Sequence, residues 1–290
     1  MERITFRQGQ GGIVGLRRKL VSVGMEAAVF LCTLMGVVAL VSVLGYVTVN
    51  GIPAINLDFF TNLPKPVGET GGGMANAIVG TLMLLVLASA IGLPVGILAG
   101  IYLAEFGDNA LGTVVRFVTD IFTGIPTIAI GIFVYTLVVL PMRSFSALAG
   151  GIALGIIMIP TVTRTTEEML RLVPHSLREA GLALGIPQWR TTLSIVLPSA
   201  AGGILTGIML AIARAGGETA PLLFTAFGNR FWSIAPDKPV AAMTLQIFNY
   251  AISPYDDWHA QAWAGSLVLV AIILVLSVAA RFFASRRSFT

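Results

Sequence analysis

The chain is dominated by apolar runs that are too long to be core helices of a soluble domain. One run extends from Val21 to about Val49, and others follow along the chain. A helix needs about 20 predominantly apolar residues to cross the hydrocarbon core of a bilayer. We therefore predict an all-α fold, a polytopic membrane helix bundle with six transmembrane helices at 22–49, 77–104, 115–140, 148–166, 199–227 and 262–283.

The scarcity of charge supports a single membrane domain. Charged residues make up 11% of the chain, against about 25% in soluble domains. The first run also exceeds the roughly 7–15 apolar residues of a signal peptide, so we expect it to be a retained span. The predicted organisation is an N-terminal segment, 1–21, followed by one transmembrane domain, 22–290. Segment 239–252 is too short to cross, and we expect an amphipathic or re-entrant helix there.

Lysine and arginine are distributed unequally between the two predicted sides, which indicates an orientation. One side carries 13 of them, at positions 3, 7, 17, 18, 19, 116, 164, 171, 178, 190, 281, 286 and 287, and the other carries four, at 65, 143, 230 and 238. The side with more positive charge faces the cytoplasm. We predict that both termini and the 167–198 connection lie there, in a cell (inner) membrane.

A polar insert at 176–198 separates two of the predicted spans and reads as a short helix-turn-helix. Ser176 and Glu179 fit a capping box, in which the hydroxyl and the carboxylate each satisfy a backbone N–H group. Gly185 fits a left-handed helix stop, and Pro187 fits the first turn of a second helix. Local structure alone can account for these residues, but a partner-binding loop on the cytoplasmic face is an equal alternative for Glu179.

The spacing within this insert is informative. It runs Glu179-Ala180-Gly181, three residues, Gly185, nine residues, Ile195, one residue, Leu197-Pro198. This register resembles the "EAA" loop of ABC-importer permeases, with Gly181 where that family usually has a second alanine. The resemblance implies a type I ABC importer permease fold whose cytoplasmic coupling helix docks on ATPase subunits, with Glu179 facing the ATPase and Gly185 setting the bend. The chain has no phosphate-binding G-x-x-x-x-G-K-[ST] motif of its own.

Two charged residues lie inside the predicted fifth span. Arg214 and Glu218 are four residues apart, which places them on one helix face. A charge inside the bilayer is costly unless it is paired or faces a hydrated path. The pair could be purely structural, or Arg214 could bind an oxyanion, since its planar fork suits such ligands. Glu218 would then orient Arg214 or accept a proton from the anion, and Thr219 would add a hydroxyl.

Other charged positions carry weaker signals. Arg116 and Asp120 are expected to form a local i,i+4 pair. Arg164 stands near Glu167 and Glu168 where the fourth span leaves the membrane, so a solvated ion-paired face is expected, and a pathway role for Arg164 stays open. The two histidines have no ligand set around them, and we predict no metal site.

Small residues recur at four-residue spacing in several spans. They are Gly92, Gly96 and Gly100, then Gly151 and Gly155, then Gly203 and Gly207. Such spacing allows helices to approach closely in lipid. Packing within the chain is the main expectation, and a subunit interface is the alternative. Prolines within predicted spans, at 94, 126 and 160, are expected to kink them.

Three sequence stretches resemble a narrower family. R-A-G-G-E-T-A-P-L-L-F-T-A at 214–226, G-G-G-M-A-N-A-I-V-G-T-L at 71–82 and G-I-P-T-I at 124–128 are similar to the PstA-type permeases of the phosphate-specific ABC importer. The resemblance implies inorganic phosphate as substrate, a PstC-type second permease, a dimeric PstB-type ATPase that binds ATP and Mg, and a PstS-type phosphate-binding protein. This chain itself is expected to bind no cofactor.

Three alternatives compete with this interpretation. The same architecture could serve another oxyanion, such as sulfate or molybdate. A proton-coupled secondary transporter would use Glu218, but it predicts inverted repeats, and the Glu179 loop has no counterpart in the first half. A membrane enzyme is least favoured, because the sequence shows no nucleophile–base pair and no metal-ligand cluster.

Overall fold

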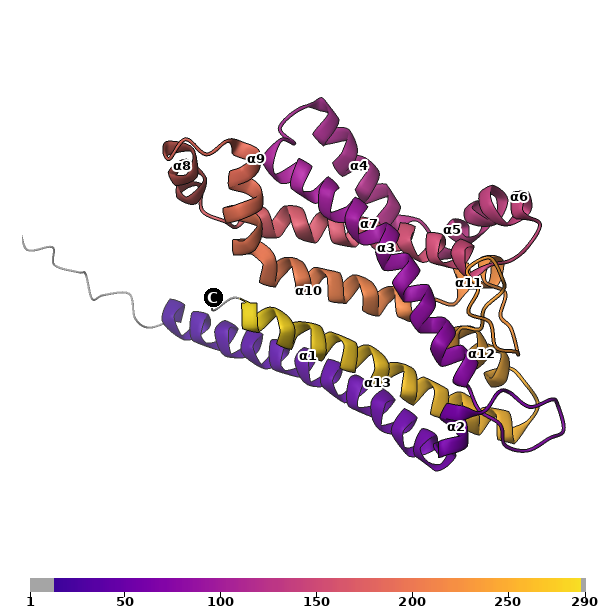
Figure 1. Cartoon of the computed structure of the whole chain (residues 1–290). Coiled ribbons are helices and arrows are strands. Elements are labelled where there is room, and N and C mark those ends of the chain that lie inside the picture. Colours follow the sequence, from indigo (N-terminus) through magenta and orange to yellow (C-terminus); the bar gives the residue numbers. More distant parts are fainter. Residues whose placement is uncertain (1–12, 288–290) are drawn as a thin grey trace, which may run out of the picture. The chain divides into compact units, whose positions relative to one another are not determined.

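The structure is a computed structural model that describes residues 13–287, with side chains described throughout from Arg17 to Ala279 (Figure 1). Within this part the fold is helical and contains no strand, only an isolated bridge between Phe227 and Val240. The helices are α1 Ile13–Gly51, α2 Leu57–Thr61, α3 Ala75–Glu105, α4 Ala110–Gly124, α5 Thr127–Val134, α6 Leu140–Met142, α7 Ala147–Arg171, α8 His175–Ala183, α9 Gln188–Thr191, α10 Leu197–Gly216, α11 Ala220–Thr225, α12 Met243–Ala251 and α13 Asp256–Arg287. Single turns of other helix types occur at Ile52–Ala54 (3-10), Tyr135–Val139 and Thr192–Val196 (both π).

The described chain confirms a polytopic all-α membrane fold. Five helices between residues 13 and 287 are long and apolar enough to cross a membrane, and a sharply bent helix pair can provide a sixth span. The chain divides into two compact units, one ending at Val49 and one running from Asn50 onward. The first unit is a single apolar helix, and it contains the predicted span 22–49. The predicted charges at Arg3 and Arg7, and the side chains of Arg281, Arg286 and Arg287, lie outside the described part.

The second unit is organised around α3 and α7, which pack through their glycines. The contacting positions rise together along both helices: Gly92 lies against Gly155, Gly96 against Val162, and Gly100 against Thr166. A Cβ atom added to Gly96 or Gly100 would stand 2.7 or 2.5 Å from the Cβ atom of the opposite residue. The two helices are therefore parallel and in closer contact than larger side chains would permit.

The third set of glycines, Gly203 and Gly207, joins α10 to α7. Gly203 lies against Met169 and Gly207 against Thr165, so the positions run in opposite order and the helices are antiparallel. These contacts bear out the expectation that the small-residue spacing serves packing within the chain. The buried residues of α3, α5, α7, α10 and α11 form one apolar core.

The predicted third span, 115–140, is sharply bent at Pro126, in agreement with the expectation that this proline kinks it. α4 and the helical segment Thr127–Met142 meet at an angle of 103° around Ile125-Pro126, because proline cannot supply the helical N–H and restricts the residue before it. The parallel arrangement of α3 and α7 nevertheless requires the chain between them to return to the end where α3 began. The bent pair therefore carries the chain back across the bundle.

The predicted fifth span, 199–227, is displaced toward the N-terminus. The helix continues without a break from Gln188 to Gly216 and then ends, so that Gly217 to Thr219 separate α10 from α11. The π turn Thr192–Val196 joins α9 to α10; in it the Leu197 N–H bonds to the Thr192 carbonyl, five residues back. This wider turn lets the helix accommodate Pro198, which has no N–H group. The predicted short helix at 239–252 is confirmed as α12.

Candidate functional site

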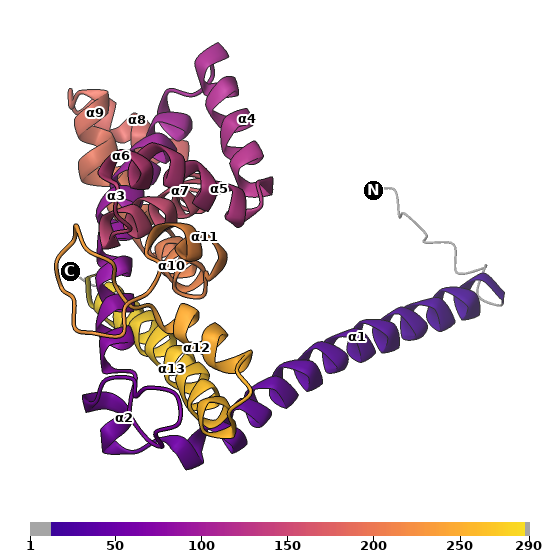
Figure 2. The same cartoon turned by 90° about the vertical axis from the view of Figure 1, so that its right-hand side faces the viewer.

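The polar insert forms α8 and α9 at the end of α3 opposite to α12 (Figures 1 and 2). α8 ends at Ala183, and Gly185 forms the predicted left-handed stop after it, with a φ of +76°. The Ile186 N–H bonds to the Gly181 carbonyl and the Gly185 N–H to the Leu182 carbonyl, the paired bonds of a Schellman stop. The predicted capping box is wrong: α8 begins at His175 directly after Pro174, and no side chain caps it. Ser176 therefore already lies within the helix.

Arg178 anchors α8 to the rest of the bundle. Its guanidinium bonds to the Glu105 carboxylate at the end of α3, with a shortest distance of 2.8 Å. It also donates to the carbonyls of Val173 and Leu170 at 2.6 and 2.8 Å. The side chains of Arg178 and Glu105 are 16% and 4% exposed. Arg178 is therefore largely buried by its contact with Glu105.

The remaining residues of the insert divide between buried and outward positions. Glu179 and Ala180 are exposed, and Glu179 forms no ion pair within the described chain. Gly181 is buried, and a Cβ atom there would lie 2.7 Å from a Thr191 methyl group, so the glycine allows α8 to lie directly on α9. Pro198 is in the continuous helix beyond the π turn rather than at a helix start.

Four exposed apolar side chains follow Glu179 in the α8–α9 insert and the π turn after it. Leu182, Leu184, Trp189 and Leu193 are 50%, 79%, 58% and 51% exposed. Exposed apolar residues near a carboxylate that forms no ion pair in the described chain, on a helix that a buried ion pair fixes at the neighbouring Arg178, are typical of an interaction site. We name the exposed surface of Glu179 and these four residues the outward face of α8–α9.

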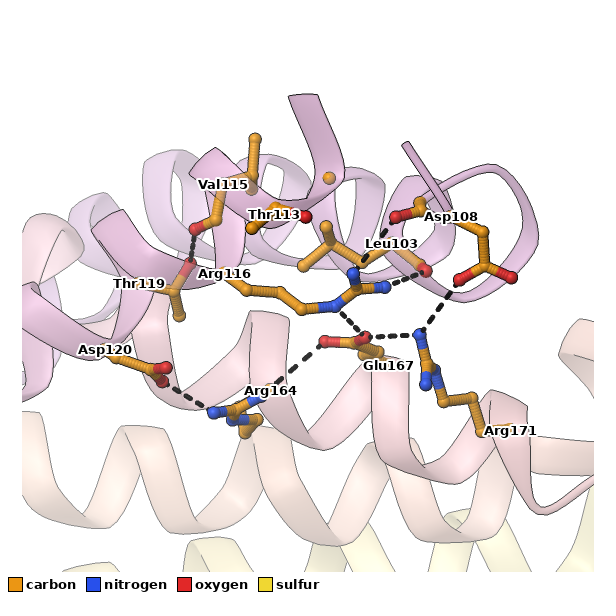
Figure 3. Close-up of polar contacts among 12 residues, drawn as sticks. Leu103, Asp108, Thr113, Val115, Arg116, Thr119, Asp120, Arg164, Glu167 and Arg171 are labelled. Carbon is orange, nitrogen blue, oxygen red and sulfur yellow. Dashed lines mark hydrogen bonds and ion pairs between the residues drawn. The ribbon is translucent and has the colours of Figure 1, made fainter. Parts of the chain in front are cut away.

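A second set of charges joins α4 to α7 around Glu167 (Figure 3). The Glu167 side chain is 5% exposed; it accepts a hydrogen bond from Arg116 Nε at 2.7 Å and forms an ion pair with Arg171 at 3.1 Å. Arg164 lies 3.9 Å from its other oxygen. Arg116 also donates to the carbonyls of Leu103 and Gly107 at the end of α3, so the network joins three helices.

Two sequence expectations fail at this network. Arg116 and Asp120 do not pair with each other: Arg116 binds Glu167, and Asp120 binds Arg164 at 2.6 Å. Glu167 is not on a solvated face, although Glu168 is exposed. Glu167 is buried where α4 packs on α7, and a buried carboxylate needs cationic partners; Arg116 of α4 supplies one, in addition to Arg171 and Arg164 of α7 itself. Arg164 remains 44% exposed.

The predicted pair in the fifth span lies at the break after α10. Arg214 is in the last turn of α10, while Glu218 follows the helix end, so they do not share a helix face as expected. Their closest atoms are 3.9 Å apart, and their side chains are 43% and 16% exposed. The Glu218 carbonyl accepts from the Thr244 hydroxyl of α12 at 2.9 Å, and Thr219 precedes α11. Arg214 therefore has guanidinium donors that no carboxylate within 13–287 occupies closely.

No group of three or more His, Cys, Asp or Glu residues that could hold a metal ion occurs in the described part of the chain. The cluster around Glu167 contains acidic groups, but arginines occupy them. The chemistry that these sites offer is recognition of charge and of apolar surface.

Comparison with known proteins gives a consistent result. The family of binding-protein-dependent transport system inner membrane components matches residues 92–289. The phosphate transport system permease protein PstA of Yersinia pestis is 49% identical over 86% of this chain and 84% of its own length. The PstA of Xylella fastidiosa strain Temecula1 is 51% identical over 80% of this chain and 81% of its own.

The fold is also similar to a solved one. A structure of the MetNI methionine ABC transporter in inward facing conformations matches 73% of this chain and 94% of its own, with a TM-score of 0.53 at 18% identity. At this identity the likeness concerns the fold alone.

Proposed function

Because the chain belongs to the PstA-type permeases within the binding-protein-dependent transport system inner membrane components, we propose that it is the permease subunit of an ATP-driven importer of inorganic phosphate. It is a multi-pass membrane protein and a transporter subunit, not an enzyme. It forms half of the translocation path, and a PstC-type permease forms the other half. A PstB-type ATPase dimer binds and hydrolyses ATP with Mg, and a PstS-type protein delivers phosphate.

The proposed path includes the break between α10 and α11. The observation that carries this assignment is the half-exposed Arg214, whose distance of 3.9 Å to Glu218 leaves donors available. A guanidinium offers an oxyanion paired N–H groups. Glu218 keeps Arg214 oriented between turnovers or accepts the proton of a monoprotonated phosphate, and sulfate has no such proton to give. Thr219 lies beside them. Arg164, 44% exposed, is a second pathway residue.

The proposed ATPase contact is the outward face of α8–α9. Glu179 and Ala180 meet the ATPase there, while Gly181, Gly185 and Pro198 shape the α8–α9 turn and the helix that follows. This assignment places α8 and both chain termini in the cytoplasm, consistent with the distribution of Lys and Arg. Residues 22–290 then act as one permease domain with the coupling loop at 176–198. ATP has a different affinity for the two access states of the transporter, and this difference drives the switch between them.

Uptake of radiolabelled phosphate tests the proposal in cells that lack this chain. Wild type should restore uptake, and excess sulfate should not compete. Arg214→Gln should abolish uptake while the complex assembles normally, and Arg143→Gln, an exposed arginine outside the sites, should not. If wild type restores no uptake, the substrate assignment is wrong. If Arg214→Gln transports normally, Arg214 has only a structural role.

A further inference from the structure

A pocket of about 460 Å³ lies beside α12, at the end of α3 opposite to α8. One face of α12 lines it, through Ala242, Leu245, Gln246, Asn249 and Tyr250. The remaining walls come from the loop after α2, the loop after α11, and the first turn of α13. All of these segments belong to the compact unit that begins at Asn50. None of the sites described above includes this pocket.

The pocket lining is cationic and rich in hydrogen-bond donors. It contains Arg230 and Lys65 but no carboxylate. Arg230 is exposed and forms no ion pair in the described chain. Lys65 donates one bond to the Thr70 carbonyl at 3.1 Å, which leaves two of its three N–H donors. The nearby carboxylate of Asp257 accepts from the Gly71 N–H instead. The pocket is therefore suited to an anion.

Neutral donors stand on the α12 wall. The Tyr250 hydroxyl accepts from the Gln246 amide at 3.2 Å, so its own hydrogen is free to be donated. Burial raises the pKa of Tyr250, while the Gln246 bond and Arg230 oppose that rise, and the hydroxyl remains protonated at neutral pH. The Asn249 amide is exposed with no bonded partner within 13–287.

The loop that carries Arg230 is held in a defined shape. Phe227, at the end of α11, has a φ of +61°, and Gly228 has a φ of +88°. A left-handed phenylalanine is uncommon and costs energy, and its ring is retained by stacking on Phe145 at 4.5 Å. The Asn229 side chain bonds to the Pro239 carbonyl and the Phe231 N–H. Asn76 of α3 binds the Asn229 carbonyl at 2.7 Å.

The pocket is also adjacent to the proposed path. Thr244, which bonds to the Glu218 carbonyl, belongs to the same α12 whose other face lines the pocket. The Met243 N–H bonds to the Thr81 hydroxyl of α3 and fixes the position of this helix. A ligand in the pocket therefore lies one helix width from the break that contains Glu218.

We propose that this pocket is a binding site for a phosphate group, with Arg230 and Lys65 as its cationic ligands and the side chains of Tyr250 and Asn249 as neutral donors. Charge-assisted hydrogen bonds from both cations supply most of the affinity. The phosphate can come from free orthophosphate, which would make the pocket an outer waiting site for the transported ion, or from a lipid headgroup. The first source rests on the proposed function.

Phosphorus NMR on the assembled transporter in a maltoside detergent tests the proposal. Inorganic phosphate is titrated, and broadening of its resonance is compared among wild type, Lys65→Gln/Arg230→Gln and the control Lys238→Gln. Lys238 is an exposed cation of the same 228–242 loop that does not line the pocket. The double variant should raise the half-maximal phosphate concentration about tenfold or more, and the control should not change it. Native mass spectrometry of co-purified phospholipid forms the second arm.

The NMR titration and the mass spectrometry together distinguish free orthophosphate from a lipid headgroup as the source of the bound phosphate. Loss of orthophosphate broadening in the double variant identifies the free ion, and loss of bound phospholipid alone identifies a headgroup. Equal binding of both ligands to wild type and double variant, or binding of neither to wild type, would overturn the site. Phosphate uptake measured with the same variants keeps the proposals distinct. If wild type fails to import, the proposed function falls; if wild type imports but binds neither ligand, only the pocket assignment falls.

Discussion

Replacing Glu105 with Gln is expected to uncouple ATP hydrolysis from phosphate uptake while leaving the membrane bundle folded. Glu105 ends α3, and its carboxylate accepts from Arg178 Nη2 at 2.8 Å, from Arg178 Nε at 3.1 Å and from the Thr192 hydroxyl at 3.4 Å. It thus joins α3 to α8 and to the π turn that leads into α10. The glutamine side chain retains the shape but loses the charge that holds Arg178.

The free-energy cost of Glu105→Gln is set by how deeply the Glu105–Arg178 ion pair is buried. Removing one partner of a buried ion pair costs about 3–5 kcal/mol, because it leaves an uncompensated charge. Arg178 keeps its bonds to the Val173 and Leu170 carbonyls and is 16% exposed, so we expect the lower end, about 3 kcal/mol. That value shifts the equilibrium between docked and undocked α8 by roughly a hundredfold toward undocking.

The assay compares ATPase activity and phosphate uptake in the same proteoliposomes. Glu105→Gln should retain ATP hydrolysis but lower the phosphate taken up per ATP, and hydrogen exchange of the α8 amides should accelerate relative to α3. Glu168→Gln is the matched control, since Glu168 is an exposed glutamate at the end of α7. Glu105→Leu combined with Arg178→Met should recover part of the docking, because apolar residues can replace a buried ion pair. Wild-type uptake per ATP and unchanged α8 exchange in Glu105→Gln would refute the reasoning.

Three further perturbations test the packing described above. Glu167→Gln should lower the thermal stability of the purified complex, by about 3 kcal/mol at the α4–α7 junction; an unchanged melting temperature would mean that the arginine network adds nothing. Gly100→Ala should destabilise by about 1–3 kcal/mol, because its Cβ atom would stand 2.5 Å from the Thr166 Cβ atom. Gly202→Ala, with no atom within 4 Å, is its control and should be neutral or stabilising, and equal effects would contradict the close-packed seam. Gly185→Ala should strain the α8 stop by about 1 kcal/mol, because alanine disfavours a positive φ; unaltered hydrogen exchange in α8 and α9 would count against this.

Properties that repeat along one segment could be predicted from the sequence. The existence of the membrane spans follows from the lengths of the apolar runs. The close glycine contacts among α3, α7 and α10 follow from the four-residue spacing of the glycines, and both are local patterns. The Gly185 stop is also local, because only the residues around it determine a left-handed helix end. The resemblance of 214–226 to the PstA-type permeases indicated the family that the comparisons show.

Contacts between distant segments could not be predicted in this way. Glu105 lies 73 residues from Arg178, and nothing in the sequence around Glu105 identifies that partner. Arg116 has Asp120 one turn away, yet the buried Glu167 binds it. The capping box failed because Pro174 starts α8 earlier than Ser176 would. The end of α10 was missed because apolar residues resume after Glu218 and continue to Phe227, whereas the helix stops at Gly216.

Within the compact unit that begins at Asn50, α3 connects the two places at which the proposed partners and ligands act. Its last residue, Glu105, holds α8, while near its start Asn76 and Thr81 hold the Arg230 loop and α12. Between these points the glycine seam interlocks α3 with α7, and a close-packed interface of this kind resists sliding. A displacement of α8 by the proposed ATPase partner is therefore expected to move α3 and α7 together, and to reach the pocket beside α12 without a separate chain of side-chain rearrangements.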